Sequence, residues 1–167
     1  MKKKCILLYI LIGFSLLSCE KDDDKFTTDS PFYALKDNRQ WISTSSWANY
    51  SLTNEKMVIA GSKRDSEYYQ DEQLHLSFKT TDISESNTVT DFYARWDFVI
   101  GGDAIGDSYI IDSNYNNLIT INSFDTDKKK ISGTFELRLV RDENRSDAGE
   151  KMYYKNGFFS LDYNESE

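Results

Sequence analysis

The feature that most constrains the fold is an alternation of apolar and polar residues with a period of two. It is clearest in three stretches, QLHLSFK (73–79), FYARWDF (92–98) and KISGTFELRL (130–139). Such a period places the apolar side chains on one face of a β-strand and the polar side chains on the other. No segment shows the 3.6-residue period of an amphipathic helix. The pattern therefore predicts an all-β chain.

Shorter apolar runs predict further strands between these three. They are FYALK (32–36), KMVIAGS (56–62), DSYIID (107–112), LITINSF (118–124) and GFFSLDY (157–163). Residues 40–52 also predict a strand, but the alternation slips between Trp41 and Trp47, which indicates a bulge near Ser45 and Ser46. The turn signals that separate the strands include GGDAIGD, DTDKKK and Asn156–Gly157. About eight or nine strands predict a single antiparallel β-sandwich or flattened barrel.

The N-terminal segment has the three parts of a secretory signal. Lysines at positions 2–4 precede an apolar run, and Ser18 then precedes Cys19. The run is too short for a membrane-spanning helix of roughly 20 apolar residues. The last four residues, LLSC, resemble the lipobox of bacterial lipoproteins, in which the cysteine is acylated and becomes the new N-terminus. The resemblance implies that residues 1–18 are removed and that Cys19 carries the lipid, palmitate included, that holds the protein at a membrane.

An acidic tether follows the cysteine and precedes the folded part of the chain. We expect residues 19–30 to hold the lipidated cysteine and the tether, and residues 31–165 to form a single β domain. The acids directly after the cysteine also resemble the export signal of surface lipoproteins in Bacteroidota. This implies attachment to the outer membrane with the domain facing outward, and the periplasmic face is the alternative.

Charge and composition exclude several kinds of partner and site. Losing three signal lysines changes the net charge from −8 to −11, which argues against nucleic acid as a partner. Cys5 leaves with the signal and Cys19 is acylated, so no disulfide or thiolate metal site is expected. His75 is the one histidine, and no motif for a metal or a cofactor is present. The sequence therefore predicts neither a metal site nor a cofactor.

Two charged pairs and three tryptophans are interpreted as structural. Asp97 and Glu136 each have an arginine two positions away on the same strand face, Arg95 and Arg138, so two same-face ion pairs are expected. The tryptophans are assigned to the core, together with many of the 21 other phenylalanine and tyrosine side chains. They are Trp41, Trp47 and Trp96.

The candidate binding residues are two adjacent tyrosines in a polar loop. Tyr68 and Tyr69 lie within SKRDSEYYQDEQ (62–73), between two expected strands. Exposed tyrosines offer a large contact area with few rotatable bonds, and they can stack on a sugar or anchor a protein partner. A simpler reading is that one ring covers the sheet edge while the other is half solvated.

The order of motifs resembles a group of small, uncharacterised lipoproteins found in Bacteroidota, each with a domain of unknown function. The pattern is an early turn followed by Trp, an Ile-x-Gly strand, Ile-x-Ile before Ile-Ser-Gly-Thr-Phe, and a closing Asn-Gly-x-Phe. The matching positions are Trp41, Ile59, Gly61, Ile119, Ile121, Asp125, Ile131, Ser132, Gly133, Thr134, Phe135, Asn156, Gly157 and Phe159. The chain departs at the first turn, where Asp37–Asn38–Arg39 replaces the usual glycine. The resemblance implies a β fold and a lipid anchor, and it implies no activity.

These observations together favour a binding protein at the cell envelope over an enzyme. The expected ligand is a glycan, a small ligand or another envelope protein. The alternatives are a structural accessory subunit of an envelope complex, or a hydrolase that uses two of the 28 acidic residues.

Overall fold

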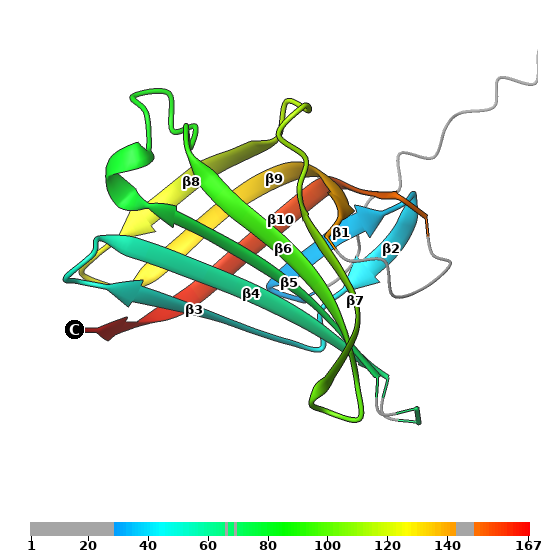
Figure 1. Cartoon of the computed structure of the whole chain (residues 1–167). Helices are drawn as coiled ribbons and strands as arrows, with labels where there is room; N and C mark the ends of the chain where they lie inside the picture. The colour runs from blue at the N-terminus through cyan, green and yellow to red at the C-terminus, as the bar shows by residue number, and fades with distance from the viewer. Residues whose placement is uncertain (1–28, 66, 69, 143–148) are drawn as a thin grey trace, which may run out of the picture.

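The protein is a curved β-sheet, as the alternation predicts (Figure 1). The computed structural model describes residues 29–65, 67–68, 70–142 and 149–167. Ten strands and one short 3₁₀-helix, η1 (Thr80–Asp82), make up the described part. The strands are β1 (Phe32–Lys36), β2 (Arg39–Ile42), β3 (Ser45–Ser51), β4 (Lys56–Asp65), β5 (Gln70–Lys79), β6 (Phe92–Ile100), β7 (Ala104–Ile111), β8 (Leu118–Asp125), β9 (Lys130–Arg141) and β10 (Lys151–Ser166).

All ten strands belong to one sheet that curls into a flattened barrel. Strands β3 to β7 form a meander in which each strand pairs antiparallel with the next. β7 pairs with β9 through three residue pairs, and β9 also pairs with β8 and β10. β10 reaches β3 through four parallel residue pairs, the one exception to the antiparallel arrangement. The two layers of the flattened barrel are therefore joined by the β7–β9 and β10–β3 seams (Figure 1).

The segment predicted as one bulged strand, 40–52, is two strands. β2 ends at Ile42 and pairs only with β1, whereas β3 begins at Ser45 and pairs with β4 and β10. The break explains the slip in the alternation. Trp41 faces the core and is 1% exposed, but Trp47 faces outward and is 48% exposed. The assignment of Trp47 to the core is therefore wrong, because its strand starts with a new phase.

β10 is longer than predicted because it contains a bulge. Met152 and Tyr154 are buried in its first half, whereas every second residue from Gly157 to Tyr163 is buried in its second half. Lys155 and Asn156 intervene, both exposed, and the register shifts between Tyr154 and Gly157 against β9. The pair Asn156–Gly157, predicted as a turn, is thus a bulge inside a strand, where Asn156 adopts a φ of 49°.

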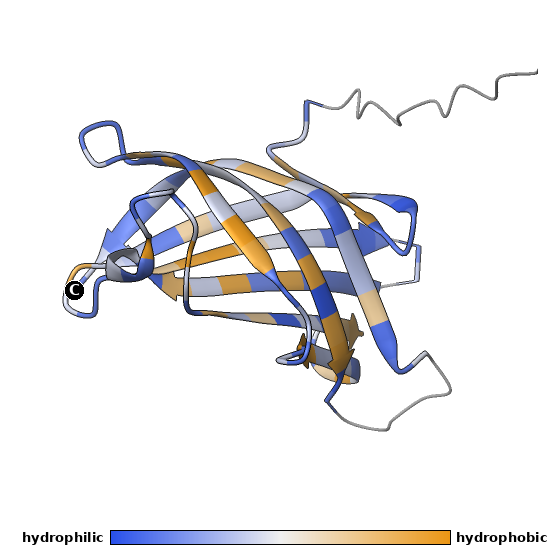
Figure 2. Cartoon of the chain, turned by 90° about the horizontal axis from the view of Figure 1, so that it is seen from above, coloured by the Kyte–Doolittle hydropathy of each residue, from blue (hydrophilic) through white to orange (hydrophobic). Residues whose placement is uncertain are grey.

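The core lies between the two layers and is rich in aromatic rings. Trp41 contacts Phe32 and Tyr154 with ring centres 5.8 Å apart in both cases. Phe32 also lies 5.5 Å from Phe135, which joins β1 to β9. Hydrophobic and hydrophilic residues alternate along the strands, as Figure 2 shows. The burial of one face of each strand supplies the main stabilising term, about 25 cal/mol per Å² of apolar area.

Candidate functional site

An outward-facing hollow of about 420 Å³ lies over β1, β8, β9 and β10. Its size falls within the range of roughly 300–1,000 Å³ that is usual for small-molecule sites. We call it the outer hollow. The side chains around it are Tyr33, Leu118, Thr134, Glu136, Asn156 and Phe158, and its floor is formed by Phe135 and Gly157.

Two stacked aromatic rings form one side of the outer hollow. Tyr33 of β1 and Phe158 of β10 are direct partners across the two strands. Their ring centres are 5.2 Å apart and their planes meet at 28°. Both side chains are half-buried, so part of each ring faces solvent. A flat pair of this kind presents a rigid apolar surface to a ligand.

Polar groups stand beside the aromatic pair. Thr134 is the register partner of Phe158, and Glu136 is the partner of Leu118 across β8 and β9. Glu136 and Asn156 are both exposed. Together these side chains offer a hydroxyl, a carboxylate and an amide, which both donate and accept hydrogen bonds. The hollow thus combines an apolar platform with groups that bind hydroxyls.

The bulge in β10 creates the floor of the outer hollow. Gly157 follows the two outward residues of the bulge and lies over the ring of Phe135. A Cβ at position 157 would lie 2.4 Å from that ring, well inside van der Waals contact. Glycine is therefore required for the buried Phe135 ring to pack against the β10 backbone beneath the hollow.

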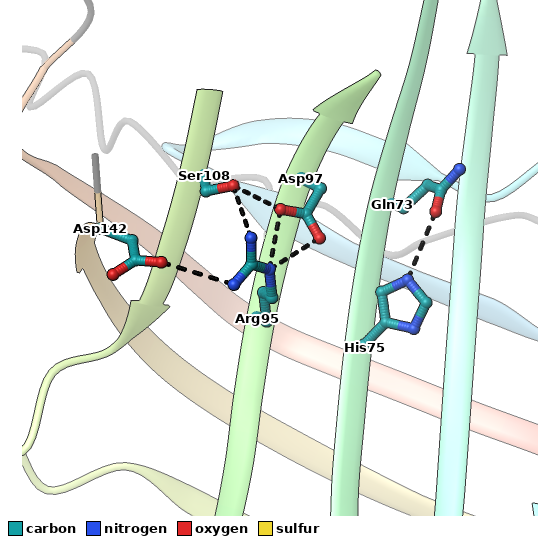
Figure 3. Close-up of polar contacts among 6 residues, drawn as sticks. All are labelled: Gln73, His75, Arg95, Asp97, Ser108 and Asp142. Atoms are coloured by element: carbon teal, nitrogen blue, oxygen red, sulfur yellow. Dashed lines mark hydrogen bonds and ion pairs between the residues drawn. The ribbon is translucent and has the colours of Figure 1, made fainter. Parts of the chain in front are cut away.

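A second polar cluster lies on the outer face of β5, β6 and β7 (Figure 3). The Arg95 Nε donates to both carboxylate oxygens of Asp97 at 2.9 Å, which confirms the expected same-face ion pair. Arg95 also donates to Ser108 at 2.9 Å and lies 3.4 Å from Asp142. The hydrogen bond to Asp97 raises the pKa of Arg95. The guanidinium is thus held by partners on three strands or loops.

This cluster is not arranged as a serine nucleophile site. The Ser108 hydroxyl donates to Asp97 at 2.5 Å, and Ser108 is 2% exposed. His75 Nε2 lies 3.4 Å from the Gln73 side-chain oxygen and not against the serine (Figure 3). A general base must contact the nucleophile. Burial lowers the pKa of His75, while Asp97 opposes this shift and Arg95 adds to it.

The prediction of a second same-face ion pair, between Glu136 and Arg138, is wrong. Arg138 binds Asp112 at 2.7 Å instead of Glu136. Asp112 is 4% exposed and also accepts the backbone N–H of Asn114 at 2.9 Å. Arg138 further lies over the ring of Tyr115, 4.4 Å from its centre. The connection after β7 thus supplies the acid, and Glu136 is left to face the outer hollow.

The structure places one of the two candidate tyrosines. Tyr68 is 61% exposed in the β4–β5 connection, and it is not among the residues that line the outer hollow. Tyr69 lies outside the described residues, as does the lipid-attachment residue Cys19. The structure therefore does not place Tyr68 at the outer hollow.

Sequence reasoning did not predict the outer hollow: it assigned Glu136 to an ion pair and Asn156–Gly157 to a turn. Tyr33 and Phe158 are aromatic residues on the outward faces of strands whose other faces are buried. The alternation in the sequence could have identified each of them as an outward-facing aromatic residue. The sequence did not reveal that β1 pairs with β10, because the two strands are distant along the chain.

Among residues 29–65, 67–68, 70–142 and 149–167, no group of three or more histidine, cysteine or acidic side chains is positioned to hold a metal. No helix in those ranges is long and apolar enough to span a membrane.

Comparison with known proteins gives a family for most of the chain. Residues 28–161 match the model of a domain of unknown function, DUF6252. No curated protein and no solved structure matches the chain. The matched range begins just before β1 and ends within β10, so it holds nearly the whole sheet and every residue of the outer hollow. The chain therefore belongs to the DUF6252 family of domains of unknown function.

Proposed function

We propose that the protein is a surface lipoprotein whose β domain binds a glycan in the outer hollow. The lipid anchor is proposed from the signal layout and the lipobox resemblance that ends at Cys19. The outward-facing outer-membrane position is proposed from the acidic run after that cysteine. Both acyl anchoring and an acidic tether would hold the domain a short distance from the membrane surface.

The observation that carries this function is the stacked pair of Tyr33 and Phe158 beside Glu136 and Asn156. One face of a sugar ring presents C–H groups, and these pack well on flat aromatic rings. The sugar hydroxyls extend sideways from the ring, where a carboxylate and an amide can accept and donate hydrogen bonds. The outer hollow supplies both kinds of contact next to each other.

The same lining supports binding over hydrolysis. Glycoside hydrolysis needs two carboxyl groups on either side of the scissile bond. Glu136 is the one acidic residue among the described side chains that line the outer hollow. A bound sugar would therefore be held by a carboxylate without a second one to complete the reaction.

A glycan microarray tests the proposed function. We expect the purified protein to bind a subset of the immobilised oligosaccharides, and the double variant Tyr33→Ala, Phe158→Ala to lose at least tenfold in affinity. Loss of a stacking contact worth about 1–3 kcal/mol gives an effect of this order.

The control variant is Tyr93→Ala, which removes an exposed tyrosine from β6, on a part of the sheet away from the outer hollow. Its binding should equal that of the unchanged protein. Equal binding by the double variant, with an unchanged melting temperature, would show that the outer hollow is not the glycan site. Absence of any bound glycan would contradict the proposed function and favour a protein partner.

A further inference from the structure

A second hollow lies at one end of the barrel, near the turn between β1 and β2, and its volume is about 360 Å³. We call it the barrel mouth. Its lining contains three bases and two acids, although the chain as a whole is acidic. The charged side chains are Lys36, Asp37, Arg39, Lys63 and Glu72. The mouth is thus a locally basic site in an acidic protein.

Only one of the three bases is neutralised within the mouth. Lys36 Nζ lies 2.5 Å from Glu72, whose same carboxylate oxygen accepts the Trp41 indole N–H at 3.1 Å. Asp37 accepts the backbone N–H of Tyr153 at 2.9 Å. Both acids are therefore engaged by other donors.

Arg39 and Lys63 form no ion pair with any residue in the described part of the chain. Both side chains are exposed and approach the mouth from different strands, β2 and β4. Burial lowers the pKa of Lys36, Glu72 and Asp37 oppose this shift, and repulsion by the charge of Lys63 adds to it. An added anion would relieve that repulsion.

Two buried hydrogen-bond donors without a partner belong to residues that pack against side chains of the mouth but do not line it. The Tyr154 hydroxyl and the Trp96 indole N–H have no hydrogen-bond partner among the described residues. The Tyr154 ring packs against Trp41, and Lys36 lies 4.1 Å above the centre of the Trp96 ring. Buried donors normally have a partner. Because both atoms are buried and neither residue lines the mouth, the anion site rests on Arg39 and Lys63 and not on these donors.

We propose that the barrel mouth binds the acid group of a small anionic ligand between Arg39 and Lys63. Guanidinium and ammonium groups form strong charge-assisted hydrogen bonds to carboxylate and phosphate oxygens. Trp41 lines the mouth from below and is 1% exposed, and its indole N–H holds Glu72 in place. The site is separate from the outer hollow, because no residue lines both. A negative result for anion binding at the barrel mouth would therefore not count against glycan binding in the outer hollow.

Nuclear magnetic resonance titration of the purified protein tests this site. The probes are glucuronate and inorganic phosphate, with glucose as the uncharged match for glucuronate. We expect one or both anions to shift the Trp41 indole N–H and the Arg39 side-chain signals, and glucose to leave them unchanged. Glucuronate alone would identify a carboxylate as the ligand group, and phosphate alone would identify a phosphate. Absence of a shift with both anions, or an equal shift with glucose, would overturn the proposal.

Two double variants that remove the same charge distinguish binding at the barrel mouth from non-specific attraction of anions to the whole protein. The double variant Arg39→Gln, Lys63→Gln should weaken anion binding about tenfold or more, because two charge-assisted hydrogen bonds are lost. The control is Lys128→Gln, Lys130→Gln, which removes the same charge from two exposed residues, one in the β8–β9 turn and one at the start of β9, at the opposite end of the molecule (Figure 1). Equal weakening by both double variants would show that only the overall charge matters and would also overturn the proposal.

Discussion

At the scale of single residues, the interior is packed so closely that its neighbours require a glycine at position 133. Gly133 lies in β9 opposite Phe159 of β10. A Cβ at this position would lie 2.4 Å from the backbone oxygen of Thr120 and 2.6 Å from the Phe159 ring. The backbone oxygen cannot move without breaking the β8–β9 pairing. Glycine at 133 therefore lets three strands approach each other.

We predict that Gly133→Ala lowers the free energy of unfolding by about 1–3 kcal/mol, the usual cost of overpacking a core. Urea denaturation with circular dichroism measures the change. The control is Gly149→Ala, where the nearest atom to the added Cβ lies 3.7 Å away. If both variants unfold at the same urea concentration, the close approach at Gly133 does not constrain the fold.

His75 provides a second residue-scale prediction because it is the one histidine in the chain. Burial against the sheet disfavours its charged form, so we expect its pKa to lie below 6.5. The unfolded chain then binds the proton more readily, and stability falls as the pH drops through 6.5 toward the folded-state pKa.

Titration of the His75 ring proton by nuclear magnetic resonance gives this pKa directly. The variant His75→Gln should remove the loss of stability in that pH range. A pKa at or above 6.5 would show that the interaction with Asp97 outweighs burial.

At the scale of strands, the end of β10 joins the two layers of the barrel. Residues 163–166 form the parallel pairing with β3, and Tyr163 is 3% exposed. Tyr163 packs against Tyr50 of β3 and Phe124 of β8, with ring centres 5.9 Å and 5.6 Å away. The C-terminal end of β10 thus forms the β10–β3 seam.

We predict that deletion of residues 163–167 destabilises the protein by about 3 kcal/mol or more, since it removes a buried aromatic side chain and a strand pairing. The melting temperature measures this loss. Deletion of Glu167 alone is the control, because this residue lies beyond β10. A melting temperature unchanged by the longer deletion would show that the β10–β3 seam contributes little.

The alternation predicted strands wherever the phase stays constant. β5, β6 and β9 were identified because each buries every second residue along most of its length. The prediction failed where the phase changes, at the break between β2 and β3 and at the bulge in β10. Both changes depend on pairing with distant strands, so a local pattern does not reveal them.

The outer hollow was hidden from the sequence for a related reason. Its aromatic pair joins residues 33 and 158, which become neighbours only because β1 pairs with β10. Alternation could place each ring on an outer face, but not next to the other. The spacing along one strand predicted the ion pair of Arg95 with Asp97 correctly. The same spacing failed for Arg138, because Asp112 reaches it from the connection after β7, which a local pattern does not reveal.

At the scale of the whole molecule, the two hollows lie on different parts of the domain. The outer hollow lies on the outside of the sheet, whereas the barrel mouth lies at one end of the barrel. The proposed membrane attachment involves only the N-terminal segment that precedes the described domain. The proposed anchor can therefore be tested without altering the fold.

We predict that Cys19→Ala moves the protein from the membrane fraction to the soluble fraction, because the thiol that would carry the lipid is gone. Fractionation of cells followed by immunoblotting measures the distribution. Cys5→Ala is the matched control, since it removes the other cysteine within the apolar run and should leave the distribution unchanged. Unchanged fractionation of the Cys19 variant would rule out the lipid anchor.

The most direct test of glycan binding in the outer hollow is nuclear magnetic resonance with labelled protein and an oligosaccharide that it binds on the array. We predict that the ring signals of Tyr33 and Phe158 and the side-chain amide of Asn156 shift on titration. Signals of Trp47 on β3 should stay in place, although this tryptophan is also exposed. Shifts confined to Trp47, with none at Tyr33 or Phe158, would contradict the assignment of the outer hollow as the glycan site.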